Sequence, residues 1–397
     1  MVTKRQQQAI AEILQLGGRV ETDHEGPAGV VVFVDLGSHR DVTDASLASL
    51  RGLDQLRWLN LENTQITDAG IEHLCDLAEL RHLDLGGTEI TDAGLAELRR
   101  FEQLQFLGLT FTKVRSGGFE AISHLTRLRE LVLLGTQISD ASLAHLAVLP
   151  DLQVLILSYT QVGDAGLAQL VRQTRLEELH LGATWISNAG LAHLSGLSRI
   201  EKLHLGATRI GDAGLIHLRD LTRLTTLRLR ETEVGDAGLE HVGHLTHLRE
   251  LDLRHTNVGD AGLAHLENLR DLEQLHLGGT KITDAGLVHL GAMTRLQELH
   301  LGATRVTNAG LLHLAGLTRL HTLRLWETGI TDAGLAHLAH LNQLQTLELW
   351  ETGVTSSGMN FLRGLPRLRR LHLGATRVSD AAILDLQSVI PDLKVER

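Results

Sequence analysis

The sequence is poor in several residue types, and each scarcity excludes a class of protein. Its 397 residues include one cysteine, four prolines and only 3% aromatics. A single cysteine, Cys75, excludes a disulfide framework and fits a reducing compartment. No stretch approaches the roughly 18 consecutive apolar residues of a membrane span. The formal net charge of −11 argues against nucleic acid as the main partner, because phosphate binding needs a basic surface.

The N-terminus also lacks the features of a targeting segment. It reads MVTKRQQQAIAEILQLGG, with two basic residues but no long apolar run. We therefore expect no signal peptide. Together with the missing apolar runs, this predicts a soluble cytoplasmic protein that does not bind membranes.

What the sequence has in abundance is a 24-residue repeat. One copy reads LQELHLGATRVTNAGLLHLAGLTR (296–319), and fourteen copies follow one another from Leu56 to about Val389, after an imperfect copy near Val31. The LxxLxL segment ends in an apolar/polar alternation, as in a β-strand. The leucines of the following DAGLxxLxxL lie three apart, which suits a short helix. The repeat therefore predicts a right-handed α/β solenoid, with a parallel sheet on the concave side and helices on the convex side.

The pattern L-x-x-L-x-L-x-x-T-x-I-T-D-A-G-L resembles the leucine-rich repeat family over nearly the whole chain. It is similar to bacterial 24-residue repeats of the TDAGL type and to the cysteine-containing repeats that follow F-box domains. The resemblance implies an α/β horseshoe that binds a partner on its concave face. Most of the family has Asn or Cys at the ninth position, whereas all fourteen regular copies here have Thr. No F-box can be recognised before the repeats.

The chain divides into three expected parts. Residues 1–29 form an N-terminal cap, residues 30–388 a solenoid of about 15 repeats, and residues 389–397 a C-terminal cap. Pro391 breaks the frame before a last partial strand, LKV (393–395).

The N-terminal cap should hold a helix and a hairpin. Thr3 and Gln6 predict a capping box at the start of the helix, which a glycine pair (17–18) ends. RVETD (19–23), a turn and VVFVDL (31–36) then predict a hairpin. This unit would cover the exposed edge of the first repeat strand.

Two polar positions recur with structural consequences. The residue before AGL is Asp in eleven copies, Asn in two and Ser in two. Uncharged Ser argues against a calcium ladder, whereas all three are good helix N-caps, so we expect them to cap the helices. The recurring Thr should bond backbone groups that the strand leaves unpaired.

The residues between the leucines predict the binding surface. In ELVLLGTQI (130–138), Leu131 and Leu133 belong to the core, so Val132 and Leu134 face the concave side. With their neighbours they would form an exposed apolar patch, and such patches mark interaction sites. Its members are Phe106, Phe111, Val132, Leu134, Val154, Ile156 and Tyr159. The patch would bind another protein, mediate self-association, or be covered by flanking loops.

A second concave region is rich in arginine and tryptophan, the residues most frequent in binding hot spots. Its candidates are Arg228, Arg230, Arg254, Arg324, Trp326 and Trp350. Glycine occupies the corresponding position of other copies, which would leave shallow pockets beside these bulky side chains. The alternative is internal pairing, for example of Arg230 with Glu231, with tryptophan lying over aliphatic stems.

Histidines fall side by side on two pairs of neighbouring strands. The pairs are His180 with His204 and His276 with His300. At about 4.8 Å between strands, the two imidazoles of a pair could share a ligand or metal, or repel when protonated.

The sequence contains no nucleotide-binding, serine-hydrolase or HExxH motif, so we expect no enzymatic activity, cofactor or metal. The first hypothesis is a non-catalytic protein–protein interaction scaffold. The second is an adaptor or substrate receptor of a ubiquitin-ligase-like complex, which needs a recruiting module. The third is a ligand or metal sensor that uses the concave histidine pairs.

Overall fold

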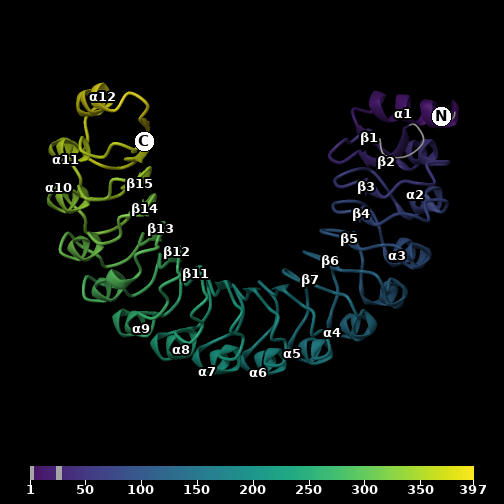
Figure 1. Ribbon diagram of the computed structural model, residues 1–397, viewed down its shortest axis with the longest axis horizontal. Coiled ribbons are helices and arrows are strands. Elements are labelled where there is room, and N and C mark those ends of the chain that lie inside the picture. The colour runs from purple at the N-terminus through teal and green to yellow at the C-terminus, as the bar shows by residue number, and fades with distance from the viewer. Residues whose placement is uncertain (1–3, 24–28) are drawn as a thin grey trace. The chain divides into compact units, whose positions relative to one another are not determined.

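The chain forms two compact units, one reaching from the N-terminus to Ile200 and the other from Glu201 to Arg397. The computed structural model describes residues 4–23 and 29–397. Within each unit, short strands form the inner layer of a curved stack and short helices the outer layer (Figure 1). The predicted α/β leucine-rich repeat solenoid is confirmed, whereas the three predicted domain boundaries remain a prediction.

The first unit runs from a helix and a hairpin into regular repeats. Its strands are β1 (Arg19–Asp23), β2 (Val30–Asp35), β3 (Trp58–Asn60), β4 (His82–Asp84), β5 (Phe106–Gly108), β6 (Glu130–Val132), β7 (Val154–Ile156) and β8 (Glu178–His180). Its α-helices are α1 (Lys4–Gln15), α2 (Asp68–Ile71), α3 (Asp92–Glu97), α4 (Asp140–Leu143), α5 (Asp164–Leu167) and α6 (Asn188–Leu191). Its 3₁₀ helices are η1 (Asp44–Leu50), η2 (Glu72–Leu74), η3 (Leu98–Arg100), η4 (Ser116–His124), η5 (Ala144–Val148), η6 (Ala168–Leu170) and η7 (Ala192–Leu194).

The second unit continues the repeat to the C-terminus. Its strands are β9 (Lys202–His204), β10 (Thr226–Arg228), β11 (Glu250–Asp252), β12 (Gln274–His276), β13 (Glu298–His300), β14 (Thr322–Arg324), β15 (Thr346–Glu348), β16 (Arg370–His372) and β17 (Lys394–Glu396). Its α-helices are α7 (Asp212–Leu215), α8 (Asp236–Val242), α9 (Asp260–Ala264), α10 (Asp332–Leu335), α11 (Met359–Leu362) and α12 (Asp380–Val389). Its 3₁₀ helices are η8 (Ile216–Leu218), η9 (Gly286–Ala292), η10 (Gly310–Leu314), η11 (Ala336–Leu338) and η12 (Ser356–Gly358).

The strands pair in parallel and in the register that the repeat dictates. In the first unit β2 to β8 pair in chain order, and in the second β9 to β17 do the same. Leu131 therefore lies beside Leu155, one repeat later. Leu131 and Leu133 are fully buried, whereas Val132 between them lies on the opposite side of the strand. Each buried leucine contributes about 1.5–3 kcal/mol relative to an exposed one, so the leucines fix which face is concave.

The N-terminal helix and hairpin are present. Helix α1 ends at a glycine pair: the Gly18 N–H donates to the Ile13 carbonyl at 2.9 Å, and Gly17 has a φ of +85°. Strand β1 pairs antiparallel with β2 and so covers its edge. Thr3 of the predicted capping box and residues 24–28 of the predicted turn lie outside the described residues. In the part of the chain that the structure describes, no helix combines the length and apolarity of a membrane span.

The recurring aspartates are not helix N-caps, so that prediction is wrong. The N-cap is the preceding residue, as at Thr67, and Asp68 is the first helical residue. The Asp68 carboxylate instead accepts the backbone N–H of Thr91 at 2.8 Å and the Thr91 hydroxyl at 2.5 Å. Asp260 binds Thr283 in the same way in the second unit. Each of the recurring aspartates from Asp44 to Asp332 therefore connects its own repeat to the next.

The same carboxylates explain the glycine of the DAG motif. A Cβ added at Gly262 would lie 2.6 Å from Oδ1 of Asp236, the aspartate one repeat earlier. Where Ser116 replaces the aspartate, the glycine of the next repeat is replaced by Ser142, and the Ser142 hydroxyl donates to the Ser116 Oγ at 2.9 Å. The two positions are thus matched in size across neighbouring repeats.

The recurring threonine hydroxyl donates to a backbone carbonyl three residues earlier, as at Thr64, which bonds the Leu61 carbonyl at 2.6 Å. The threonines of the regular copies from 64 to 352 are buried. The prediction that they satisfy backbone groups at the end of the strand is therefore confirmed.

Candidate functional site

Two aromatic side chains project from the first unit immediately after strands β5 and β7. Phe111 and Tyr159 expose 64% and 68% of their surface, and their φ angles are +52° and +59°. A positive φ is unfavourable for bulky side chains, yet the equivalent position has a positive φ in every regular repeat and is glycine in three others (Gly87, Gly135 and Gly279). The positive φ therefore belongs to the repeat, whereas a large, exposed aromatic side chain at this position is not required by it and points to an interaction surface.

Four smaller apolar side chains lie between and around these rings. Val132 of β6 pairs in register with Ile156 of β7, as the sequence predicts. Val132, Leu134, Val154 and Ile156 are half-buried rather than fully exposed, because neighbouring strands shield one another's side chains. We call the six residues the apolar cluster: Phe111, Val132, Leu134, Val154, Ile156 and Tyr159.

Phe106 does not belong to this cluster, which corrects the predicted patch. Its strand position pairs with Glu130, so a charged residue separates it from Val154. Phe106 instead stacks on His82, with ring centroids 3.9 Å apart and planes 6° apart. The stack continues through Trp58 to Phe33, with centroid separations of 4.6 and 4.1 Å.

We call Phe33, Trp58, His82 and Phe106 the aromatic row. Sequence analysis missed it, although these residues occupy the same strand position in four successive copies. Parallel strands place such positions about 4.8 Å apart, which is close to a ring-stacking distance. An alignment of the repeats by strand position could have predicted the row.

Beside the aromatic row lie three carboxylates that sequence analysis also missed. Asp35 and Asp84 flank Asn60 on strands β2 to β4, and Glu62 follows two residues after Asn60. We call Asp35, Glu62 and Asp84 the carboxylate trio, and all three are half-buried. Among residues 4–23 and 29–397, no lysine, arginine or histidine forms an ion pair with them.

The electrostatics of the trio follow from this lack of a cation. Burial raises the pKa of Glu62, and the charges of Asp84 and Asp35 raise it further. Burial also raises the pKa of Asp84, although the Gly86 N–H that donates to it acts in the opposite direction. His82 offers no compensating charge, because burial lowers its pKa to about 4. The aromatic row therefore supplies no positive charge that would offset the three carboxyl groups.

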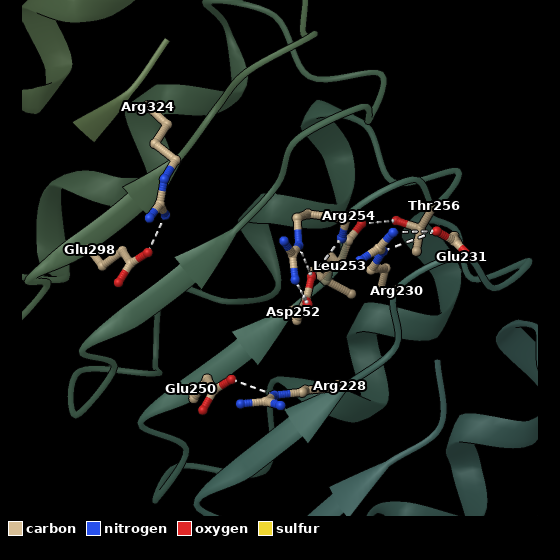
Figure 2. Close-up of polar contacts among 10 residues, drawn as sticks. All are labelled: Arg228, Arg230, Glu231, Glu250, Asp252, Leu253, Arg254, Thr256, Glu298 and Arg324. Carbon is tan, nitrogen blue, oxygen red and sulfur yellow. Dashed lines mark hydrogen bonds and ion pairs between the residues drawn. The ribbon is translucent and has the colours of Figure 1, made fainter. Parts of the chain in front are cut away.

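The four predicted arginines of the second unit have the opposite character, because each is paired with a carboxylate of its own unit: Arg228, Arg230, Arg254 and Arg324. Figure 2 shows the guanidinium groups directed at neighbouring carboxylates. Arg228 Nε lies 2.6 Å from Glu250, and Arg230 Nη2 lies 2.7 Å from Glu231. Arg324 binds Glu298 and also Glu348, the latter at 2.9 Å.

Arg254 and Asp252 form the most buried of these pairs. Two hydrogen bonds of 2.9 and 2.5 Å join the guanidinium to the carboxylate, and Asp252 is only 3% exposed. Burial alone would raise the pKa of Asp252, but the hydrogen bonds and charge of Arg254 outweigh it and lower that pKa. The charges of Asp252 and Arg254 thus neutralise each other within the second unit.

The tryptophans of the second unit fill the space above the glycines. Trp326 and Trp350 stack with centroids 4.6 Å apart. The Trp326 ring covers Gly302, and the His300 ring covers Gly278. The expected shallow pockets beside these glycines are therefore occupied by side chains. A cavity of about 320 Å³ remains at the C-terminal end, where Trp350, His372 and Gly374 are among the lining residues.

The histidine pairs do not form a metal site. His276 and His300 lie on paired strands with ring centroids 6.1 Å apart, and His300 is 6% exposed. Burial lowers the pKa of His276, and burial with the Arg324 charge lowers the pKa of His300 to about 3. His180 contacts Glu178 at 2.8 Å in the first unit, whereas His204 belongs to the second. Within the described ranges, no three His, Cys, Asp or Glu side chains are arranged to hold a metal.

Comparison with known proteins identifies the repeats. A family model described as a leucine-rich repeat region matches residues 206–383, and a second leucine-rich repeat model matches residues 79–98 and 148–171. No curated protein matches the chain.

Several solved structures share the fold. An internalin (inlF) from Listeria monocytogenes aligns with a TM-score of 0.58 and 22% identity, covering 100% of this chain and 97% of its own. A leucine-rich repeat protein of Leptospira interrogans aligns with a TM-score of 0.62 and 17% identity, covering 89% and 92%. The HAESA receptor kinase ectodomain of Arabidopsis aligns with a TM-score of 0.58 and 18% identity, covering 98% and 76%. At these identities the structures show the fold alone, and with the family models they lead to one conclusion: the chain is a leucine-rich repeat protein.

Proposed function

We propose that the chain is a non-catalytic, cytoplasmic scaffold that binds another protein on the concave face of its first unit. The observation that carries this proposal is the pair Phe111 and Tyr159, exposed at positive φ beside the half-buried rest of the apolar cluster. Aromatic side chains lose little conformational entropy on binding and dominate protein interfaces. The HAESA ectodomain, solved with a peptide hormone ligand, is an example of polypeptide binding by this fold.

The arginine–tryptophan region of the second unit is the less favourable candidate. Arg228, Arg230, Arg254 and Arg324 already bind carboxylates of their own unit. A partner would have to displace these pairs and desolvate them, which costs free energy. The apolar cluster requires no such displacement.

The test compares wild type with a Phe111→Gly/Tyr159→Gly variant. Glycine tolerates positive φ, so the variant removes both rings without straining the backbone. Ala183→Gly is the matched control, since it lies at the equivalent position three repeats after Phe111 and one repeat after Tyr159. Proteins captured from a lysate by each variant are identified by mass spectrometry, and the partner is purified for calorimetry.

We expect the double variant to bind the purified partner at least about tenfold more weakly, and Ala183→Gly to bind it like wild type. Equal binding by the double variant would refute the proposal. Sedimentation velocity of the same proteins tests the alternative of self-association. Dimers of wild type that the double variant fails to form would assign the apolar cluster to a second copy of the chain.

A further inference from the structure

The carboxylate trio carries charge that nothing in the described part of the first unit neutralises. Asp35 Oδ1 accepts the Gly37 N–H and the Asn60 side-chain N–H, each at 3.0 Å. Asp84 Oδ1 accepts the Gly86 N–H at 2.9 Å. These bonds leave the second oxygen of each aspartate, and both oxygens of Glu62, without a hydrogen-bond donor among the described residues.

Asp35 and Asp84 serve the fold through these backbone hydrogen bonds, but the combined charge of the trio is costly to it. Like charges held together in a partly buried place repel one another, and the raised pKa of Glu62 reflects this repulsion. His82 stays neutral between Trp58 and Phe106, so it does not relieve the repulsion. A cation from outside the chain would relieve it, and the gain would be larger here than for fully solvated carboxylates.

The trio is also continuous with the apolar cluster along one row of the sheet. Asp84 pairs with Gly108, Gly108 with Val132 and Val132 with Ile156. Three strand spacings of about 4.8 Å place Asp84 about 14 Å from Ile156. About four residues of extended polypeptide span that distance.

We propose that the partner presents an extended, basic segment whose lysine or arginine side chains contact Asp35, Glu62 and Asp84, while apolar side chains about four residues away pack on the apolar cluster. This inference rests on the proposed function and adds the chemistry of the partner. Charge complementarity selects a basic segment, and the adjoining apolar side chains select a polypeptide over a small cation.

The experiment measures peptide binding to the full chain by fluorescence anisotropy. The probes are labelled peptides of equal length in which every second residue is Ser. The remaining positions are Lys in the first half and Leu in the second (Lys/Leu), Lys in the first half and Ser in the second (Lys/Ser), or Glu in the first half and Leu in the second (Glu/Leu), so that residues four apart lie on the same face. The variants are Glu62→Gln/Asp84→Asn and Phe111→Gly/Tyr159→Gly. The matched control is Glu72→Gln/Glu120→Gln, which removes two exposed carboxylates from the convex side of the same unit. It therefore has the same net charge as the Glu62→Gln/Asp84→Asn variant.

We expect the Lys/Leu peptide to bind most tightly and to bind more weakly as salt rises to about 0.15 M. The Glu62→Gln/Asp84→Asn variant should lose at least about tenfold in affinity and most of its salt dependence, whereas the convex control should behave like wild type. The Lys/Ser peptide should bind weakly, since it engages the charge alone.

The two proposals fail in different ways. If Phe111→Gly/Tyr159→Gly abolishes binding while the carboxylate variant leaves it unchanged, the apolar docking surface stands and the basic partner is refuted. If the Glu/Leu peptide binds as well as the Lys/Leu peptide, or if no Lys/Leu peptide binds at millimolar concentration, the basic partner is likewise refuted. If neither variant weakens the binding of a purified natural partner, both proposals are refuted.

Discussion

The two units are built from one repeat, yet their concave faces differ in whether the charged side chains are paired with one another. In the second unit Arg254 is bound to Asp252 and Arg324 to Glu298 and Glu348, so the charged side chains satisfy one another. In the described part of the first unit the carboxylate trio has no cation, and the apolar cluster exposes two aromatic rings. The buried leucines are equivalent in both. The difference therefore lies in the residues that the solenoid leaves free to vary.

This comparison separates a surface whose charged side chains have internal partners from one whose carboxylates lack them among the described residues. A side chain with an internal partner gains little from an external one, because the first contact must be broken. A side chain without an internal partner gains the full free energy of the external contact, since it has no earlier contact to break. Four substitutions test whether the two faces differ in this way.

The largest effect is expected from Arg254→Met. The change leaves the Asp252 carboxylate buried without its cation, and removing one partner of such a pair costs on the order of 3 kcal/mol. Arg230→Met is the control, since its pair with Glu231 is half exposed and should contribute less than about 1 kcal/mol. Urea unfolding followed by circular dichroism measures both. Equal losses would mean that burial does not distinguish the two pairs.

The second prediction concerns acid. The folded-state pKa of His300 is about 3, whereas the unfolded imidazole has a pKa of about 6.5. Between these values the unfolded state binds one more proton, so the free energy of unfolding decreases as pH falls from about 6.5. We expect His300→Phe to reduce this slope by up to about 1.4 kcal/mol per pH unit. His313→Phe, on the exposed convex side, is the control. An unchanged slope for His300→Phe would show that His300 titrates normally.

A smaller effect of opposite sign is expected from Glu62→Gln. Removing one charge from the trio relieves repulsion, so the free energy of unfolding should rise by less than about 1 kcal/mol, and less so at high salt. Glu120→Gln, exposed on the convex side, should change nothing. Thermal unfolding at two salt concentrations measures both. Destabilisation by Glu62→Gln would assign the carboxylate a structural role and weaken the case for a basic partner.

The smallest effect is expected from Phe111→Gly. Relief of the positive φ and the added freedom of glycine in the unfolded chain nearly cancel, so the free energy of unfolding should stay within about 1 kcal/mol of wild type. Chemical unfolding measures it, with Ala183→Gly as the control. A loss well above 1 kcal/mol would show that the Phe111 ring is part of the fold, since it also lies over Gly135.

Particular residues show where prediction from the sequence succeeded. The alternation around Leu131 and Leu133 predicted which side of β6 is buried, because side chains of a strand alternate between its two faces. The recurring threonine was assigned correctly, because its hydrogen bond stays within three residues of the chain. The aspartate was assigned wrongly, because its partner lies 23 residues away in the next repeat.

The candidate site was predicted only in part, for the same reason. Phe111 and Tyr159 were identified, but their positive φ was not, because it depends on how each strand leaves the sheet. Phe106 belongs to the aromatic row rather than to the predicted patch, since Glu130 lies between it and Val154 in the strand register. The charge of the trio could not be foreseen, because a count of acidic residues does not tell which of them find a cation.

The sequence by itself therefore determined the repeat, the burial of its leucines and the identity of the side chains on the concave face. All of these depend on local periodicity, which a 24-residue pattern states directly. Only the tertiary structure decided which of those side chains satisfy one another. It paired Arg228, Arg254 and Arg324 with neighbouring carboxylates and left the carboxylate trio without a cation among the described residues. Pairing depends on distances between adjacent repeats, and those distances arise only when the strands stack in register.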